Sequence, residues 1–221
     1  MNFMIHACPS RMWYVNEYLI PSMLSQGIQS EDISVWCDSK GLGNLKSCMN
    51  SFLSCKNKSG GTWHLQDDVL ISKTFFTRAN KHDDGIVCGF VSKDVGPDID
   101  RDGWQLVKDM WFSFQCIRIP NDLASECGEW FYNYAVNDER FKERVAAGKS
   151  DDYLFMRFLK DNYRYESVLN LTPCLVEHVD YLLGGSIINA KRTKYHRAAF
   201  WDDQDLVIEL EEKINGGITK S

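Results

Sequence analysis

The sequence predicts an α/β fold in which helices flank a mixed, mainly parallel sheet. Short apolar runs typical of buried strands alternate with segments whose apolar residues recur at helical spacing, an order typical of a parallel α/β sheet. Polar and acidic residues follow directly after several of the apolar runs. Because ligands of such sheets bind beyond the carboxyl ends of the strands, these residues are candidates for a binding site.

The first half of the chain gives the clearest alternation. Phe3–Ala7 is an apolar run that stops at a Cys-Pro-Ser loop, and Ser10 can cap the helix that follows. Pro21 is expected to kink or interrupt that helix, and Gly27 to end it. The expected elements are strands at 3–7, 33–37 and 61–71 and helices at 11–26 and 41–55.

The second half is less regular. A polar loop is expected over 92–103, a charged surface over 138–149 and a frayed tail over 216–221. Pro120 stops a strong strand, and Asn121 or Asp122 is expected to cap the helix after it. The remaining expected elements are strands at 86–91, 111–119 and 168–171 and helices at 73–82, 151–159 and 202–215.

Length and composition are those of a folded globular protein. At 221 residues, with 44% hydrophobic and 25% charged residues, the chain can bury a sizeable core, and we expect a single domain. The 25 basic and 31 acidic residues give a net charge of −6, which argues against general, charge-driven binding of nucleic acid. No run reaches transmembrane length, so we expect no membrane span.

The eight cysteines are scattered, without a Cys-x-x-Cys pair or zinc-ligand spacing. Several lie inside apolar runs, which is typical of buried free thiols. The first residues lack the basic region and long apolar run of a signal peptide. These features predict a soluble protein of a reducing cytoplasm, and they give no signal for its oligomeric state.

The segment Gly61–Ser72 carries the strongest functional signal. It begins as an apolar strand, stops at Asp67 and Asp68, and continues as Val-Leu-Ile. Adjacent carboxylates beside a low-dielectric interior are unfavourable unless a positive partner compensates, and a divalent metal with a phosphate-bearing ligand is one such partner. The alternative is a solvated turn between two strands. An Asp-Asp pair without further signals more often forms such a turn than a metal site. Cys8–Arg11 and Asp38 also follow expected strands, and this convergence favours the functional interpretation.

Two later features have an ordinary structural interpretation. Asp151 and Asp152 open an amphipathic helix that Ser150 can cap, and the helix dipole favours acidic residues there. His178 is a lone histidine, and such a residue is more often a hydrogen-bonded polar side chain than a metal ligand. On local grounds the structural interpretation is the stronger one for all three residues.

Taken in order, these features resemble the GT-A glycosyltransferase fold, a Rossmann-type α/β architecture. Gln66–Asp68 is similar to the acidic motif that this family places at a strand end, although its first residue is Gln where an acid is common. Asp151–Leu154 resembles the acidic helix start of the acceptor half. Thr172–Val179, followed by Gly185–Ser186, resembles the C-terminal segment that carries a histidine. The resemblance spans about residues 3–201; each motif is weak alone, and their order and spacing are more specific.

The resemblance implies a division of the chain. Residues 1–91 would form a half that binds a nucleotide-sugar, residues 92–201 a half that binds the acceptor, and residues 202–221 a C-terminal helix and tail. All three parts would belong to one GT-A-like domain.

The resemblance also implies roles for individual residues. Asp68, supported by Asp67, would hold Mn²⁺ or Mg²⁺ against the diphosphate, with His178 as a further ligand. Asp152 or Asp151 would be the general base of an inverting transfer. The nucleotide pocket would be lined by Cys8, Pro9, Ser10, Arg11, Asp38 and Asp67, and a basic lid over it would contain Arg192, Lys194 and His196.

The implied activity is that of a metal-dependent glycosyltransferase that moves a sugar from a nucleotide-sugar to an acceptor hydroxyl. Two other classes stay open: a non-catalytic module that binds a nucleotide or glycan, which the Gln at position 66 favours, and a metal-dependent phosphoesterase or nuclease. If neither Asp151 nor Asp152 faces the sugar, the mechanism would be retaining. The acceptor could be a glycan, a protein or modified bases in DNA, and the sequence identifies neither the sugar nor the nucleotide.

Overall fold

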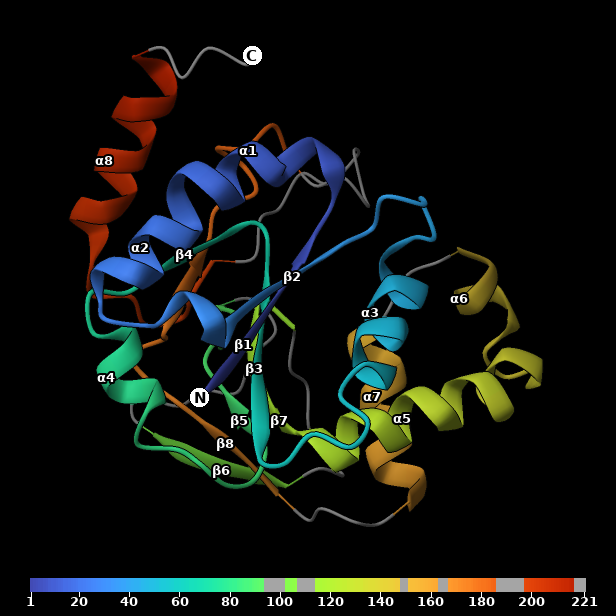
Figure 1. The fold of residues 1–221 in the computed structure, drawn as a ribbon. Coiled ribbons are helices and arrows are strands. Elements are labelled where there is room, and N and C mark those ends of the chain that lie inside the picture. Colours follow the sequence, from blue (N-terminus) through green and yellow to red (C-terminus); the bar gives the residue numbers. More distant parts are fainter. Residues whose placement is uncertain (94–101, 107–113, 148–150, 163–166, 186–196, 217–221) are drawn as a thin grey trace.

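The computed structural model describes residues 1–93, 102–106, 114–147, 151–162, 167–185 and 197–216. Within these residues a central sheet of seven strands has helices on both of its faces (Figure 1). The predicted α/β class with a mixed, mainly parallel sheet is therefore confirmed.

The central sheet is formed by β1 (Asn2–Ala7), β2 (Ile33–Cys37), β3 (Gly61–Gln66), β5 (Val87–Cys88), β6 (Gly103–Leu106), β7 (Cys116–Pro120) and β8 (Ser167–Asn170). Their order in space is β2-β1-β3-β7-β5-β8-β6. The β1–β2, β1–β3 and β5–β8 pairs are parallel, whereas β7 is antiparallel to β3 and β5, and β6 to β8. β6 and β7 consequently run against the other five strands.

Helices cover the sheet in two layers (Figure 1). One layer contains α1 (Met12–Tyr14), α2 (Ile20–Ser25), α4 (Phe75–Ala79) and α8 (Gln204–Asn215). The other contains α3 (Asn44–Leu53), α5 (Asn121–Asn133) and α7 (Asp151–Asn162), with α6 (Lys142–Ala147) at its margin. A second, two-stranded antiparallel sheet of β4 (Val69–Ile71) and β9 (Val176–His178) packs in the first layer.

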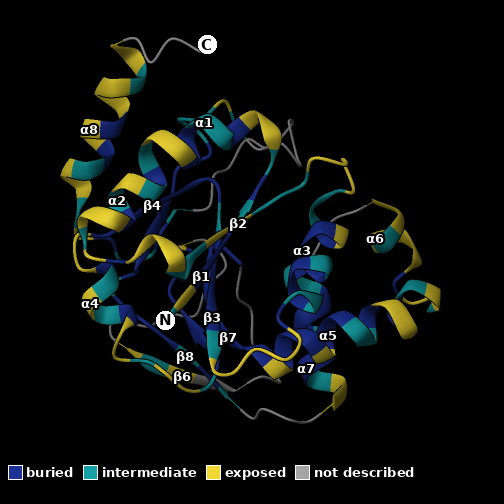
Figure 2. Ribbon diagram, in the orientation of Figure 1, coloured by how far each residue is buried: buried dark blue, intermediate teal, exposed yellow. Residues whose placement is uncertain are grey.

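Side chains that alternate along the strands point to opposite faces of the sheet and form one apolar cluster under each helix layer. Phe3 and Ile5 of β1 point into the apolar cluster under α1, α2, α4 and α8, together with Trp63 of β3. Ile117 and Ile119 of β7 point into the cluster under α3, α5 and α7. Figure 2 shows the central strands β1, β3 and β7 as mostly buried, whereas the edge strands β2 and β6 are partly exposed. Burial on both faces explains why the central strands read as continuous apolar runs in the sequence.

The helix expected over residues 11–26 is segmented. A 3₁₀ turn at Pro9–Arg11 leads into α1, and a π-helical turn at Val15–Leu19 separates α1 from α2. Pro21 lies in the first turn of α2, immediately after the π turn. Since proline lacks an N–H and its ring clashes with the carbonyl four residues earlier, a wider turn at this point accommodates it. The predicted interruption is confirmed.

Other boundaries differ from the sequence expectations. β6 was not expected, and β7 begins at Cys116, although residues 111–113 of the expected strand lie outside the described residues. Neither Asn121 nor Asp122 caps α5, because Pro120 occupies the N-cap position. The Asn121 side chain is instead buried and accepts a hydrogen bond from Thr62 Oγ1 at 2.7 Å. Ser150, the expected cap of α7, lies outside the described residues.

The thiols agree with the sequence expectation. All eight cysteines are free, and the six from Cys48 to Cys174 are buried. Burial raises the pKa of the Cys88 thiol and the Cys116 thiol, so both are held in the unreactive protonated form. In the part of the chain that the structure describes, no helix is long and apolar enough to cross a membrane.

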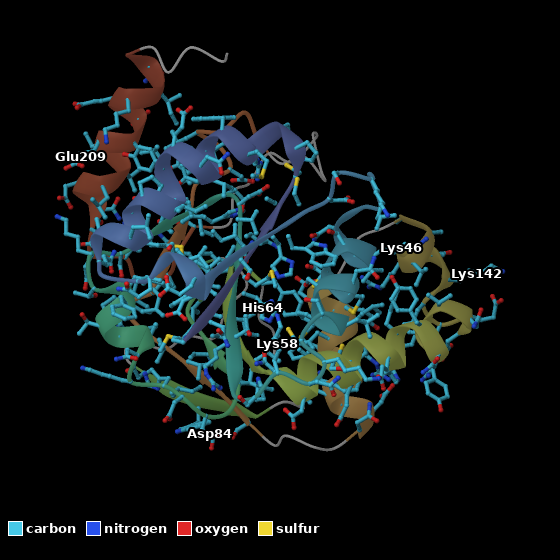
Figure 3. All side chains as sticks on the ribbon, in the orientation of Figure 1. Lys46, Lys58, His64, Asp84, Lys142 and Glu209 are labelled. Carbon is cyan, nitrogen blue, oxygen red and sulfur yellow. The ribbon has the colours of Figure 1, made fainter. Side chains whose placement is uncertain are left out.

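Two histidines, His64 buried and His6 partly buried, lie together on the face of the sheet that carries α3. His6 Nε2 on β1 lies 2.9 Å from His64 Nδ1 on β3, and the His64 ring packs edge-on against Phe52 of α3. Figure 3 shows His64 on the side of β3 that faces α3. Burial lowers the pKa of His6 to about 4 and that of His64 well below its usual value. Both rings are therefore neutral at pH 7, which allows one to donate and the other to accept.

The substitution His6→Gln tests this pair, because an amide does not titrate yet can still hydrogen-bond to His64. The folded-state pKa of His6, about 4, lies below the unfolded value of 6.5, so its stabilising contribution is complete above pH 6.5 and is lost as the pH falls toward 4. Between pH 7.5 and pH 5 the wild type should lose about 2 kcal/mol of unfolding free energy relative to the variant. Urea titrations at both pH values measure the difference, and parallel pH profiles would contradict a neutral His6.

Candidate functional site

The acidic pair forms a turn between β3 and β4, and this turn is buried. Asp67 and Asp68 are only 7% and 8% exposed, so the alternative of a solvated turn does not hold. The turn lies beyond the carboxyl end of β3, beside the parallel strand β1. Burial of two adjacent carboxylates requires compensation from the surrounding structure.

Arg11 supplies most of that compensation. The 3₁₀ turn after β1 carries its side chain back over the strand end, where it is 4% exposed. Its Nη1 donates to Asp67 Oδ1 at 3.2 Å and also to Asp68 Oδ2, and its Nη2 donates to the carbonyl of Gly185 at 2.8 Å. The backbone N–H of Cys8 donates to Asp67 Oδ2 at 2.7 Å. One guanidinium thus joins the ends of β1 and β3 to the loop after β9.

The second sheet brings His178 to the same turn. β4 and β9 pair with Val69 opposite His178, and the N–H of Val179 donates to the carbonyl of Asp68 at 2.8 Å. His178 Nε2 therefore lies 3.2 Å from Asp68 Oδ2. It also lies 3.8 Å from Asp180 Oδ2. Residues more than a hundred positions apart in the sequence meet because these short strands pair.

The two acids of the turn have opposite pKa shifts. Burial, together with the charge of Asp68, raises the pKa of the Asp67 carboxyl. Burial also acts to raise the pKa of the Asp68 carboxyl, but the charges and hydrogen bonds of His178 and Arg11 outweigh it and hold that pKa below its usual range. Asp68 is consequently the more readily ionised member of the pair and the stronger anionic ligand.

The donor types at this turn fit Mn²⁺ or Mg²⁺, which prefer carboxylate oxygens. Asp68 Oδ1 and both carboxylate oxygens of Asp180 are buried and have no hydrogen-bond donor among the described residues. In the conformation described, however, no group of three or more His, Cys, Asp or Glu side chains in the described ranges is arranged to hold a metal ion. Arg11 Nη1 contacts both Asp67 and Asp68, which places a positive group between the carboxylates that an ion would share.

The other residues expected in the nucleotide pocket also follow β1 and β2. Cys8 is half-buried, with its Sγ 3.3 Å from Ser10 Oγ, while Pro9 and Ser10 are exposed. Asp38 uses its carboxylate locally, accepting hydrogen bonds from the N–H groups of Leu42 at 2.8 Å and Gly43 at 2.9 Å. This shapes the loop into α3, so the described role of Asp38 is structural. Contact with a base or ribose stays a prediction.

Asp151 lies at the start of α7 and is buried, 6% exposed. Asn44, the first residue of α3, donates to Asp151 Oδ1 at 2.9 Å. Burial and the charge of Asp152 raise the pKa of Asp151 to about 7. Burial also raises the pKa of Asp152, whose Oδ1 accepts from the N–H of Tyr153 at 2.7 Å. A favourable helix dipole alone would lower these pKa values, so burial outweighs it here.

A chain of contacts links Asp151 to the acidic turn. Asn44 follows Gly43, whose N–H is held by Asp38, and the N–H of Asp38 donates to the carbonyl of Ala7 at 2.9 Å. Cys8, the next residue, binds Asp67. Asp151 and the acidic turn are therefore connected through the loops that follow the carboxyl ends of β1 and β2.

Some residues of the site were not found from the sequence, and some predicted ones cannot be placed. Arg192, Lys194 and His196, the expected basic lid, lie outside the described residues. Asp180, Asn44 and the Gly185 carbonyl were not predicted. Asp180 had a detectable signal, because it follows His178 by two positions, the spacing that puts side chains on one side of an extended segment.

Comparisons with known proteins give the fold a context. No protein-family model matches the chain, and no curated protein matches it. A solved structure titled "Crystal Structure of A197 from STIV" has 13% identity and a TM-score of 0.45, covering 80% of this chain and 84% of that one. The inositol-1-phosphate CTP transferase from T. maritima has 11% identity and a TM-score of 0.46, covering 99% of this chain and 98% of that one. At these values neither likeness bears on the function of this chain.

The substitution Asp151→Asn should stabilise the protein at alkaline pH. The folded-state pKa of about 7 lies above the unfolded value of 3.8, so the ionised carboxylate lowers stability as the pH rises through this interval. Asn removes the charge and keeps an oxygen for Asn44. The gain in unfolding free energy should be roughly 2–3 kcal/mol larger at pH 8 than at pH 5.

Denaturant titrations at the two pH values measure this gain. The matched control is Asp161→Asn on the same helix, where a more exposed carboxylate pairs with Arg157 at 2.8 Å and should contribute little. A gain that is equal at both pH values would contradict the raised pKa of Asp151.

Proposed function

We propose that the chain is a glycosyltransferase that uses a nucleotide-sugar donor, with the diphosphate bound at the turn of Asp67 and Asp68. The observation that supports this most is the buried acidic turn at the carboxyl edge of β3, held by Arg11 and the Cys8 N–H. In open α/β sheets this edge is where ligands bind. Arg11 contacts Asp67 and Asp68 beside the exposed residues Pro9 and Ser10. Its guanidinium can donate two hydrogen bonds to a phosphate that binds there.

The proposed roles follow from the charges described. Asp68, assisted by Asp67 and His178, would hold Mn²⁺ or Mg²⁺, an ion that when bound stabilises the charge of a departing diphosphate. Arg11 would donate to a phosphate oxygen, which is the chain's own contribution to that charge. Cys8, Pro9 and Ser10 would border the nucleotide.

Asp151 is the proposed general base. A carboxyl with a pKa of about 7 is ionised in part at neutral pH and accepts a proton better than an ordinary aspartate. In the proposed inverting step, the acceptor oxygen gives its proton to Asp151 and bonds to the anomeric carbon. The bond from that carbon to the phosphate oxygen breaks, and the nucleoside diphosphate leaves. Asp152, adjacent and less buried, is the alternative base.

The substitution Asp68→Asn tests the proposal. Thermal unfolding of the wild type with UDP, GDP, CDP or ADP and Mn²⁺ should show a rise in Tm for one nucleotide, because a ligand that binds the native state stabilises it. Hydrolysis or transfer of the corresponding nucleotide-sugar should then be measurable in the wild type. In Asp68→Asn we expect the nucleotide response and turnover to fall at least about a hundredfold, with circular dichroism unchanged.

The matched control is Asp84→Asn, in an exposed loop before β5 at the opposite edge of the sheet (Figure 3). This variant should retain wild-type binding and turnover. Wild-type turnover in Asp68→Asn would contradict the proposed site. Nucleotide binding without turnover of any nucleotide-sugar would instead indicate a binding module, and release of phosphate from simple esters would indicate a phosphoesterase.

A further inference from the structure

The described residues do not balance the charge of the acidic turn. Asp67 and Asp68 share Arg11 Nη1, and Asp68 and Asp180 share His178 Nε2, so three acidic side chains are linked to a single permanent positive charge, that of Arg11. His178 adds a second only when protonated. A buried carboxylate without a counter-charge is strongly unfavourable, so the cluster favours the binding of further positive charge.

Asp180 gives an independent sign of a missing ligand. It is 1% exposed, and neither carboxylate oxygen has a hydrogen-bond donor among the described residues. Its Oδ2 is directed toward His178 Nε2, 3.8 Å away, and the same nitrogen contacts Asp68. Asp68 Oδ1 likewise has no donor in the described part of the chain. Buried carboxylate oxygens of this kind are normally paired or bound to a metal ion.

The Arg11 guanidinium occupies the space between Asp67 and Asp68 that a shared metal ion would occupy. Its Nη1 contacts both Asp67 and Asp68, while its Nε is buried and has no acceptor in the described residues. Two carboxylates that share one guanidinium nitrogen cannot share a metal ion at the same time, because both cations would occupy the space between the same oxygens. Because Arg11 Nε makes no hydrogen bond to the described residues, moving the guanidinium breaks fewer hydrogen bonds. Its displacement is therefore less unfavourable.

We propose that Arg11 is the displaceable occupant of a divalent-cation site, and that Asp180 is a further carboxylate of this site. In the described conformation Arg11 compensates part of the negative charge of the acidic turn. Binding of Mn²⁺ or Mg²⁺ to Asp68 expels the guanidinium, which then becomes available to a phosphate at the same strand end. The two cations therefore compete, and each lowers the affinity of the site for the other. The inference rests on the proposed function only in taking the turn as a cation site; it does not require sugar transfer.

Mn²⁺ alone is the probe, measured by the loss of the free Mn²⁺ electron paramagnetic resonance signal and by thermal unfolding with EDTA or Mn²⁺. Arg11→Gln should bind Mn²⁺ at least about tenfold more tightly than the wild type, because the competing cation is gone. Its Tm should be lower than that of the wild type in EDTA and should rise more on addition of Mn²⁺. Adding Asp180→Asn to Arg11→Gln should weaken Mn²⁺ binding by about tenfold.

Two further variants serve as controls. Arg140→Gln removes an exposed arginine paired with Asp138 and should bind Mn²⁺ as the wild type does. Arg11→Lys keeps a positive charge for folding but cannot bridge both acids, so its Mn²⁺ affinity should lie between those of the wild type and Arg11→Gln.

Three results would overturn the inference or part of it. Equal Mn²⁺ affinity in the wild type, Arg11→Gln and Arg11→Lys would overturn the competition while leaving the proposed metal site intact. Unchanged affinity on addition of Asp180→Asn would remove Asp180 from the site. Absence of Mn²⁺ binding in every variant would overturn both this inference and the proposed metal, and nucleotide binding measured without metal would then show whether the proposed function survives.

Discussion

The contact of the Arg11 guanidinium with Asp67 and Asp68 is the constraint on which the rest of the site depends. Two adjacent carboxylates are folded into a buried turn, and the Arg11 cation, which reaches them from the neighbouring strand end, offsets the cost of burying them. The same guanidinium holds Gly185, so the loop that follows His178 is fixed by the same interaction. The parallel pairing of β1 with β3 makes this contact possible, because it places both strand ends at one edge of the sheet.

Two features at or below this edge lower the stability of the fold in part of the pH range. Asp151 is a buried carboxylate whose raised pKa of about 7 disfavours the folded state at alkaline pH. His6 and His64 pack between the sheet and α3, where they must stay neutral. Two apolar side chains at these positions would not make the unfolding free energy depend on pH. Unfavourable groups of this kind are common at functional sites. The apolar clusters on both faces of the sheet supply the stability that offsets them.

Much of the fold and part of the site could be predicted from the sequence. Apolar runs ending in polar residues marked β1, β2 and β3, and the order of strands and helices gave the convergence of Arg11, Asp38 and the acidic turn. The contacts of Arg11 could not be predicted, because they depend on the 3₁₀ turn after β1. The pairing of β4 with β9 could not be predicted either, because each strand has three residues and the two lie far apart in the chain. This pairing brings His178 and Asp180 to Asp68. The burial of Asp151 depends on the packing of α7 against α3, and no local pattern reports it.

The central claim is that the acidic turn binds a divalent cation and a diphosphate together. A crystal structure of the protein soaked with Mn²⁺ and the nucleoside diphosphate that raises its Tm, with data collected at the manganese absorption edge, tests this claim most directly. We expect an anomalous peak about 2.1 Å from an Asp68 carboxylate oxygen, with the Arg11 guanidinium moved from Asp68 to a phosphate. A diphosphate bound away from the β3–β4 turn, with Arg11 still on both acids, would contradict it.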